Sequence, residues 1–472
     1  MKNLSTLVIT LTIFFFSCSS NDDDTSTNNT NNLNVQTNDD DTSTNNTNNL
    51  NVQTNDENNT SFEYFKRFDV SSFSSNFLTE DNFFNMPAGF HYLSEGKFLI
   101  IPTLYYRYPS LPILIFQESN DSLSLISHID SEIEMPRDIK DLSSDKIVIA
   151  DTGFELIDEE WPHSNIWTFN HITGEVENIN PDKKFYHSVG VGDLNNDNSL
   201  DIISMNMGSR FSPWGGDGSI ETYLSSISGQ FDRINKFKDE DGGALNMWHD
   251  YMSGAIIVDD FFGDSRPEII KMQYTYNENF DINPYSFLIY HQNNDNLYEV
   301  LNINEEMGLF ESNGRLGACY AISLDINSDS HNDLIVFFEN SNNEEAVESF
   351  INNGENGFVY HQTIIENNIE ELYYREGTID DIDNDGDMDL ILHGWAFNAN
   401  NNVNQQLLIN NYIYLNNNGV FEKSSTDDFN PINYSWEDYE NLDWMRYVPS
   451  KKSFYLVGEK SGTVEIGKIS LK

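Results

Sequence analysis

The chain has 472 residues, and its 77 Asp and Glu against 25 Lys and Arg give a formal net charge of −52. Such a charge repels phosphate backbones and argues against nucleic-acid binding, whereas it attracts divalent cations. Two cysteines are too few for a disulfide framework. Aromatic residues make up 13% of the chain, more than a disordered acidic protein carries, so we expect a folded core. The richness in Ile, Phe, Tyr, Asn, Asp and Gly favours strands joined by tight turns.

The first 17 residues are typical of a secretory signal peptide. Lys2 precedes an apolar run over residues 4–16, which is too short for an ordinary membrane-spanning helix. Ser17 and Cys18 then resemble the cleavage site of a bacterial lipoprotein, which implies cleavage before Cys18 and a lipid on its thiol. The alternative is a plain signal peptide followed by an incidental cysteine.

A polar segment follows Cys18. Its first residues, Ser-Ser-Asn-Asp-Asp-Asp, resemble the acidic tag of surface lipoproteins of Bacteroidetes-type bacteria. The resemblance implies a lipid anchor in the outer membrane, with the protein facing the cell exterior. Residues 22–38 recur without change at 39–55, and a repeat of this composition cannot bury a core. We therefore expect a disordered tether over residues 18–60 and one folded domain over residues 61–472.

Three segments of that domain share the pattern Asp-x-Asp/Asn-x-Asp-x-x-x-Asp, followed by an apolar strand. They begin at Asp193, Asp325 and Asp381. A weaker match begins at Asp260, and at Asp138 a frame remains that has lost most of the pattern. A spacing of roughly 55–67 residues between units built of short strands indicates a propeller or a solenoid.

Each unit reads as four strands, which is the size of a propeller blade. In the third unit we expect them at residues 186–192, 200–206, 219–225 and 230–237. The last unit, residues 434–471, shows only three strands, and a strand at residues 62–68 can complete it and close the ring. The sequence thus predicts an all-β fold, a seven-bladed β-propeller within a range of six to eight blades. A parallel β-helix is the rival architecture, although its repeats are shorter.

The repeated motif resembles the FG-GAP/VCBS repeat of integrin-α-type propellers, over residues 85–430. The spacing itself suits calcium, which takes six to eight oxygen ligands. Side-chain oxygens at positions 1, 3, 5 and 9, with the carbonyl of position 7, supply such a shell. An EF-hand is excluded because it needs Glu at position 12, where this chain has Ser204, Val336 and Leu392. The alternative is that these Asp and Asn residues only form turns.

We therefore predict three structural calcium ions, and a fourth if the weaker set also binds. The predicted ligands are Asp193, Asn195, Asp197, Ser199, Asp201, Asp325, Asn327, Asp329, His331, Asp333, Asp381, Asp383, Asp385, Asp387 and Asp389, with Asp260, Asp264 and Glu268 as the weaker set.

If the acidic turns join the first and second strands of each blade, the loops at the other end of the blades are rich in aromatic residues. Aromatic faces beside Asp, Asn and Arg suit sugar rings and protein partners, and the alternative is packing between blades. The residues expected on this ligand face are Trp161, Trp214, Trp248, Tyr274, Tyr276, Tyr374, Arg375 and Trp395.

No nucleophile elbow, P-loop or metalloprotease signature occurs, and the abundant carboxylates single out no acid–base pair, so no catalytic residue is assigned. We expect a non-enzymatic, calcium-binding module at the cell surface that binds a glycan or protein, or mediates adhesion. The alternatives are a polysaccharide-degrading, lyase-like enzyme and a structural subunit of a surface complex.

Overall fold

The computed structural model describes most of one compact unit, which spans Asn59–Lys472. The described residues are 62–69, 90–101, 112–119, 122–134, 136–152, 165–180, 182, 184, 186–206, 220–226, 229–237, 252–274, 287–301, 318–339, 345–354, 357–365, 373–395, 406–407, 412–425, 434–435, 441–460 and 463–471. The signal peptide, Cys18 and the tether lie outside them, so these remain predictions. No helix within the described part could cross a bilayer.

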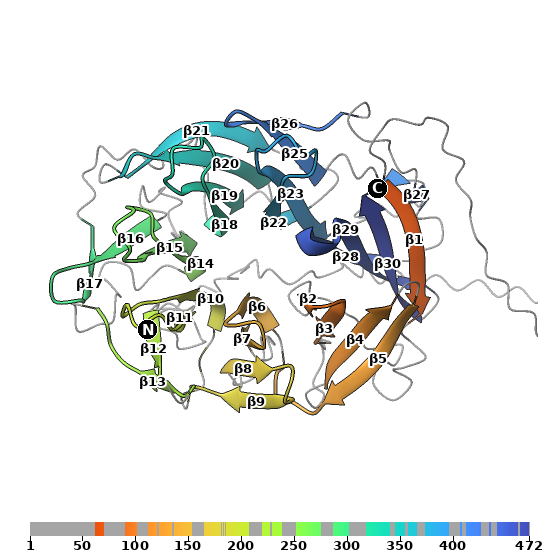
Figure 1. Ribbon diagram of the computed structural model, residues 1–472, viewed down its shortest axis with the longest axis horizontal. Coiled ribbons are helices and arrows are strands. Elements are labelled where there is room, and N and C mark those ends of the chain that lie inside the picture. Colours follow the sequence, from red (N-terminus) through yellow and green to blue (C-terminus); the bar gives the residue numbers. More distant parts are fainter. Residues whose placement is uncertain are drawn as a thin grey trace, which may run out of the picture. The chain divides into compact units, whose positions relative to one another are not determined.

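Seven four-stranded antiparallel blades stand in a ring (Figure 1), which confirms the predicted seven-bladed β-propeller and excludes the parallel β-helix. Blades 6 and 7 are also joined to each other, where Gly394 pairs with Met445. In each blade the strands follow one another from the centre of the ring to its rim.

The first three blades follow the chain without interruption. Blade 1 contains β2 (Phe90–Ser94), β3 (Lys97–Ile100), β4 (Ile113–Ser119) and β5 (Ser122–Ile129). Blade 2 contains β6 (Pro136–Asp141), β7 (Lys146–Asp151), β8 (Ile166–Asn170) and β9 (Glu175–Asn178). Blade 3 contains β10 (Tyr186–Gly192), β11 (Asp201–Asn206), β12 (Ile220–Ser225) and β13 (Phe231–Arg233), close to the ranges expected from the sequence.

The next three blades repeat the arrangement. Blade 4 contains β14 (Met252–Asp259), β15 (Glu268–Tyr274), β16 (Phe287–Gln292) and β17 (Tyr298–Val300). Blade 5 contains β18 (Ala318–Leu324), β19 (Asp333–Glu339), β20 (Glu345–Asn352) and β21 (Phe358–Ile365). Blade 6 contains β22 (Tyr373–Asp380), β23 (Asp389–Trp395), β25 (Ile413–Asn417) and β26 (Val420–Lys423). A separate two-stranded sheet joins β24 (Gln406–Leu407) to β27 (Tyr434–Ser435).

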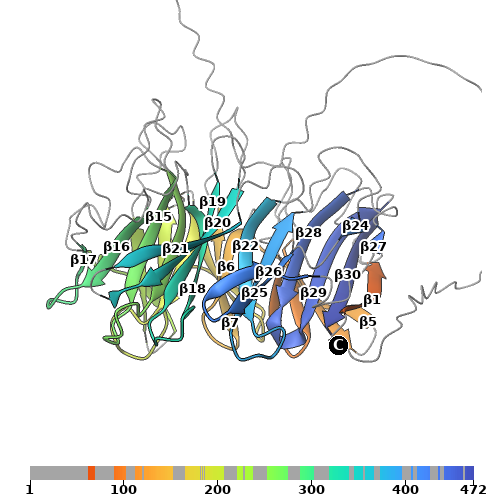
Figure 2. The ribbon, with the colours of Figure 1, turned by 90° about the horizontal axis from the view of Figure 1, so that it is seen from above.

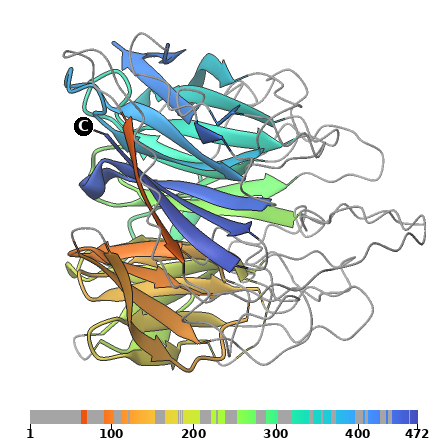
Figure 3. The ribbon, with the colours of Figure 1, turned by 90° about the vertical axis from the view of Figure 1, so that its right-hand side faces the viewer.

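Blade 7 is built from both ends of the domain. Its strands are β28 (Asn441–Val448), β29 (Ser453–Lys460), β30 (Thr463–Leu471) and β1 (Phe62–Asp69), with the 3-10 turn η6 (Pro449–Lys451) between the first two. β1 pairs antiparallel with β30, so that Phe62 lies opposite Leu471 (Figures 2 and 3). The predicted closure of the ring by an N-terminal strand is therefore confirmed.

The frame at Asp138 does not form an acidic turn. Asp138 lies inside β6, and Asp141 pairs with Ile147, so the β6–β7 turn spans only residues 142–145. Ile139 and Leu142 are buried, and the core therefore sets the strand register here. The β6–β7 turn is therefore too short to hold the nine-residue acidic motif.

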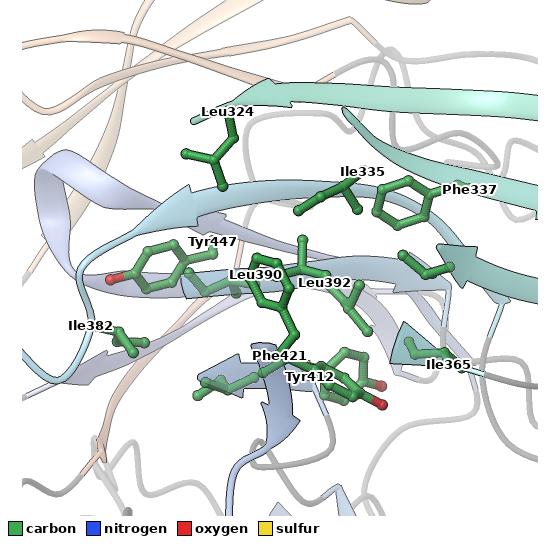
Figure 4. Close-up of a cluster of buried hydrophobic side chains, with 14 of the residues drawn as sticks. Leu324, Ile335, Phe337, Ile365, Ile382, Leu390, Leu392, Tyr412, Phe421 and Tyr447 are labelled. Carbon is green, nitrogen blue, oxygen red and sulfur yellow. The ribbon is translucent and has the colours of Figure 1, made fainter. Parts of the chain in front are cut away.

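The hydrophobic core lies between blades, since each cluster of buried side chains draws on neighbouring sheets. In one cluster, Phe337 of blade 5 packs with Leu390 and Leu392 of blade 6 and Tyr447 of blade 7 (Figure 4). Another cluster joins Ile203 and neighbouring residues of blade 3 to blade 4. Because a single sheet cannot bury its own faces, each blade depends on its neighbours for stability.

Glycine allows the inner strands of blades 3 and 4 to approach closely. A Cβ atom added at Gly190 would lie 2.7 Å from a methyl carbon of Val258 and 2.7 Å from one of Ile203. Real Cβ atoms do not come so close to neighbouring carbons, so glycine is the residue that fits at position 190 without a shift of Val258 and Ile203.

Candidate metal centres

All three full motifs lie in the turn between the first and second strands of a blade. These turns are β10–β11, β18–β19 and β22–β23, and the weaker set occupies β14–β15 in the same way. In the register, Gly192 pairs with Asp201, Leu324 with Asp333 and Asp380 with Asp389, so each closing Asp begins the second strand.

The four turns share one backbone conformation, with positive φ at positions 4 and 6. The values are 60° and 65° at Asn196 and Asn198, 68° and 65° at Gly263 and Ser265, 60° and 73° at Ser328 and Ser330, and 63° and 103° at Asn384 and Gly386. Gly386 adopts positive φ readily and Asn tolerates it, but a Ser in this region costs about 1 kcal/mol. The turns therefore need other interactions to hold them.

The carboxylate at position 1 supplies part of that support. The Asp193 carboxylate accepts hydrogen bonds from the N–H groups of Asp197, at 3.0 Å, and Asn198, at 2.7 Å. Asp325 accepts in the same way from Asp329, at 3.0 Å, and Ser330, at 2.9 Å. Carbonyl oxygens Oδ1 of Asn195 and Asn327 each accept from the N–H of position 5 as well. Oxygens of positions 1 and 3 thus converge on the N–H of position 5 in both turns.

The turn at Asp381 brings three carboxylates together. One oxygen each of Asp381, Asp383 and Asp385 lies within 4.8 Å of the other two. Asp381 Oδ1 is buried, and no described group donates a hydrogen bond to it. Burial, with the charges of Asp385 and Asp381, raises the pKa of Asp383. An acceptor without a donor, among converging carboxylates, fits the oxygen shell that calcium prefers.

The lysine nearest to this turn in the described part contacts other oxygens than those of the three carboxylates. Among the described residues no Lys or Arg pairs with the three carboxylates, while Lys452 pairs with Asp380 at 3.1 Å and donates to the carbonyl oxygen of Asp381. The three carboxylates thus have no cationic side chain of the described part as a partner.

Each position-7 residue lies beside the carboxylate of position 5. The N–H groups of Ser199, His331 and Asp387 donate to Oδ1 of Asp197, Asp329 and Asp385, at 2.8, 2.9 and 2.9 Å. These were the residues expected to offer a backbone carbonyl to calcium. The pKa of Asp197 is lowered, chiefly by its hydrogen bond with Asn195, and the N–H of Ser199 adds to the effect.

The closing carboxylate of each turn has a structural role that the sequence did not reveal. Asp201, Asp333 and Asp389 are fully buried, and each accepts two backbone hydrogen bonds. Oδ2 binds the N–H of position 2 at 2.8–2.9 Å, and Oδ1 binds an N–H at the end of the third strand at 2.7–2.8 Å. Burial raises the pKa of each to about 6. These oxygens join the turn to strands 2 and 3 and keep only part of their capacity for a metal ion.

The fourth turn contains its own cation. Asp260 accepts from the N–H groups of Asp264, at 3.0 Å, and Ser265, at 2.8 Å, as in the other turns. At position 7, however, the Arg266 guanidinium donates to Asp264 Oδ2 through Nε, at 2.9 Å, and through Nη2. This ion pair helps to lower the pKa of Asp264, although partial burial acts against it. Arg266 therefore neutralises the carboxylate that a calcium ion would need.

Two further changes weaken the fourth turn as a metal site. Position 3 is Phe262, which offers no side-chain oxygen. Position 9 is Glu268, whose Oε2 accepts from the N–H groups of Phe261, at 2.9 Å, and Phe262, at 3.1 Å. Burial raises the pKa of Glu268 to about 8. The turn keeps the backbone of the motif with fewer ligands.

Buried side-chain amides connect three of the four turns to the next blade, which sequence reasoning missed. Gln292 of blade 4 donates to the carbonyl oxygen of Leu194 at 2.7 Å, and Asn352 of blade 5 donates to that of Phe261 at 2.6 Å. Asn416 of blade 6 makes a longer contact, 3.5 Å, with the carbonyl oxygen of Ile326. Each amide ends a third strand, and each acceptor is position 2 of the preceding turn. A recurring Asn or Gln at strand ends was the available signal.

Only part of the expected ligand face falls within the described residues. Tyr274, Tyr374, Arg375 and Trp395 lie on β15, β22 and β23, at the strand ends remote from the acidic turns. Tyr373, beside Tyr374, pairs in register with Trp395. Trp161, Trp214, Trp248 and Tyr276 lie outside the described part, so this surface remains a prediction.

Comparisons with known proteins show that this chain is similar to solved structures in its fold. No family model matches the chain, and no curated protein matches it. Among similar solved structures, the Dos1 propeller has 9% identity and a TM-score of 0.45 over 87% of this chain and 95% of that one. The extracellular domain of a hybrid two component system protein of B. thetaiotaomicron has 9% identity and a TM-score of 0.43, over 86% of this chain and 39% of that one.

The extracellular domain of a one component system protein of B. thetaiotaomicron has 8% identity and a TM-score of 0.40, over 85% of this chain and 40% of that one. The present chain thus spans less than half the length of either B. thetaiotaomicron protein. Similarity at this level carries no argument about function, and the seven-bladed arrangement rests on the strand pairing of the chain itself.

Proposed function

We propose that this chain is a calcium-binding β-propeller that acts at the cell surface as a ligand-binding or adhesion module. Its ligand is a glycan or a protein, and a lipid on Cys18 anchors it in the outer membrane. The observation that carries the calcium assignment is the Asp381 turn, where three carboxylates converge around a buried oxygen that has no described donor. The Asp193 and Asp325 turns share its spacing and its backbone.

In this proposal the metal ions are structural. Carboxylates held within a few ångströms repel one another, and this repulsion opposes folding unless a cation compensates it. The turns lie next to the buried contacts between blades, so an ion in a turn stabilises the ring as well as the turn. At a calcium concentration about a hundredfold above the dissociation constant, each site adds roughly 2.7 kcal/mol to the free energy of unfolding.

The test is thermal unfolding of the domain without its signal peptide, in calcium and in chelator. We expect a large fall in melting temperature in chelator that excess calcium restores and magnesium does not. Magnesium keeps a tight octahedral shell and dehydrates reluctantly, so it fits this kind of turn poorly. An identical melting temperature with and without chelator would exclude structural calcium.

The anchor and the ligand need separate experiments. Cys18→Ser should move the protein from the membrane fraction to the soluble fraction of the cells that make it. A screen of glycans and surface proteins, with and without chelator, tests the binding role. Retention of a ligand without release of product supports a binding module, whereas unsaturated sugar products would favour a lyase.

A further inference from the structure

A cavity of about 450 Å³ lies among the inner strands of blades 2 to 6. Its walls come from β6, β10, β14, β18 and β22, which lie around the centre of the ring in Figure 1. Leu200, the eighth residue of the Asp193 turn, also lines the cavity, so the space reaches the turn end of the blades. The volume falls within the range of small-molecule binding sites.

Backbone groups make the cavity wall polar. In the described part of the sheets, β6, β10, β14 and β18 each pair only with the second strand of their own blade. Their inner edges therefore present N–H and C=O groups in alternation. Some of these are used between blades, as where Val189 N–H donates to Asp138 and Ile256 N–H to Ser188. The remainder require partners that both donate and accept.

Lys140 is held at the wall by a carboxylate that also accepts two other hydrogen bonds. Its Nζ lies 3.3 Å from Asp138 Oδ1 and 5.5 Å from the centre of the Tyr320 ring. Asp138 Oδ2 accepts from Ser188 Oγ at 2.9 Å and from Val189 N–H at 3.0 Å. An ammonium has three donors, and the side chain of Lys140 is 34% exposed. Asp138 therefore fixes Lys140 in place while donors remain for a ligand.

The charge balance favours a neutral ligand. An anion would approach against the field of a chain with a net charge of −52, and would meet Asp138 and Asp141 at the wall. A cation would meet Lys140. Hydroxyl groups both donate and accept hydrogen bonds, which matches a wall of strand edges with one ammonium. Val191, Ile257 and Ile322 add apolar surface for the C–H faces of a ring.

We propose that this cavity binds one neutral sugar unit, with Lys140 donating to a sugar oxygen and the inner strand edges completing the hydrogen bonds. None of the lining residues belongs to the expected ligand face or is a predicted calcium ligand, although Leu200 of the Asp193 turn lies in the wall. The cavity adds a small-sugar site to a surface module, and it does not depend on where larger ligands bind.

The test is calorimetric titration of the calcium-loaded domain with neutral monosaccharides and with the corresponding uronates. We expect at least one neutral sugar to bind, and its affinity to fall about tenfold or more in Lys140→Met and in Thr378→Phe. The first change removes the ammonium, and the second fills the cavity from β22. Thr378→Phe does not touch the Lys140 ion pair, so it answers the question if Lys140→Met folds poorly.

Lys146→Met is the matched control. Lys146 also pairs with a carboxylate, Glu177 at 3.6 Å, and lies 5.2 Å from the centre of the Phe231 ring, but it is not part of the cavity wall. This variant should bind sugar as the unaltered domain does. Unchanged affinity in both cavity variants, preference for uronates, or no binding by any sugar would each overturn the proposal. None of these variants alters an acidic turn, so the result is independent of the calcium experiment.

Discussion

The side-chain amide of Asn352 donates a 2.6 Å hydrogen bond to the carbonyl oxygen of Phe261, although 91 residues separate them in the chain. The same amide donates to the carbonyl oxygen of Asn332 at 2.9 Å. One buried side chain thus joins the turn of its own blade to the turn of the preceding blade. The stability of the ring and the shape of its acidic turns are therefore linked.

Replacing Asn352 should destabilise the ring. Asn352→Ala leaves the buried carbonyl oxygen of Phe261 and the half-buried one of Asn332 without this donor, and we expect a loss of about 2 kcal/mol in the free energy of unfolding, measured in urea. Asn352→Asp should cost more, because it places a carboxylate oxygen against those carbonyls. Asn294→Ala, at an exposed position, is the control and should change little. Equal effects of the three variants would contradict the proposed role of the amide.

Replacing the Asp at position 5 of each turn should distinguish the three predicted calcium turns from the fourth turn, where Arg266 occupies the site. Asp197→Asn, Asp329→Asn and Asp385→Asn should each reduce by one the number of calcium ions bound, measured by calorimetry. Asp264→Asn should leave that number unchanged, because Arg266 already pairs with Asp264. A lost ion in the Asp264 variant would show that the fourth turn binds metal as well.

The closing carboxylates predict opposite effects of acid with and without calcium. Burial raises the pKa of Asp201, Asp333 and Asp389 to about 6, above the ordinary value of about 4. Between these values the folded state binds more protons than the unfolded state, so in chelator these groups should make the domain more stable as the pH falls from about 6 to 4. In calcium, protonation of the ligands displaces the ion, so the domain should become less stable as the pH falls from about 6 to 4.

Urea unfolding at several pH values in both buffers measures this difference. Asp389→Asn should flatten the pH dependence in chelator, since it removes one of the titrating groups. The same downward trend in both buffers, unaffected by the variant, would rule out the contribution of the closing carboxylates.

Removal of β1 should open the ring. A form that begins at residue 60 keeps the pairing of β1 with β30, whereas a form that begins at residue 71 lacks it. We expect the shorter form to lose on the order of 5 kcal/mol, at roughly 1 kcal/mol per ladder hydrogen bond, and to aggregate through the exposed edge of β30. Melting temperature and light scattering measure both effects, and identical behaviour of the two forms would refute the closure role.

The sequence allowed the fold to be predicted because repeated turns and alternating apolar residues are local patterns. The ranges expected for blade 3 and the closing strand agree closely with β10–β13 and β1. At Asp138, where most of the pattern is lost, no acidic turn forms, because buried Ile139 and Leu142 fix the strand register of β6 and spacing alone does not report burial. The amide bridge from Asn352 and the pairing of Arg266 with Asp264 depend on contacts in space, and only the first has a signal in the sequence, the recurring Asn or Gln at strand ends.

The pairing of β1 with β30 has a consequence for biosynthesis. Phe62 reaches its partner Leu471 only after β30 has been made, so blade 7 cannot be completed earlier in synthesis. Until then the nascent chain is an open row of sheets with unsatisfied edges at both ends, a form that is easier to unravel than the finished ring. The ring therefore becomes rigid late, when β30 meets β1.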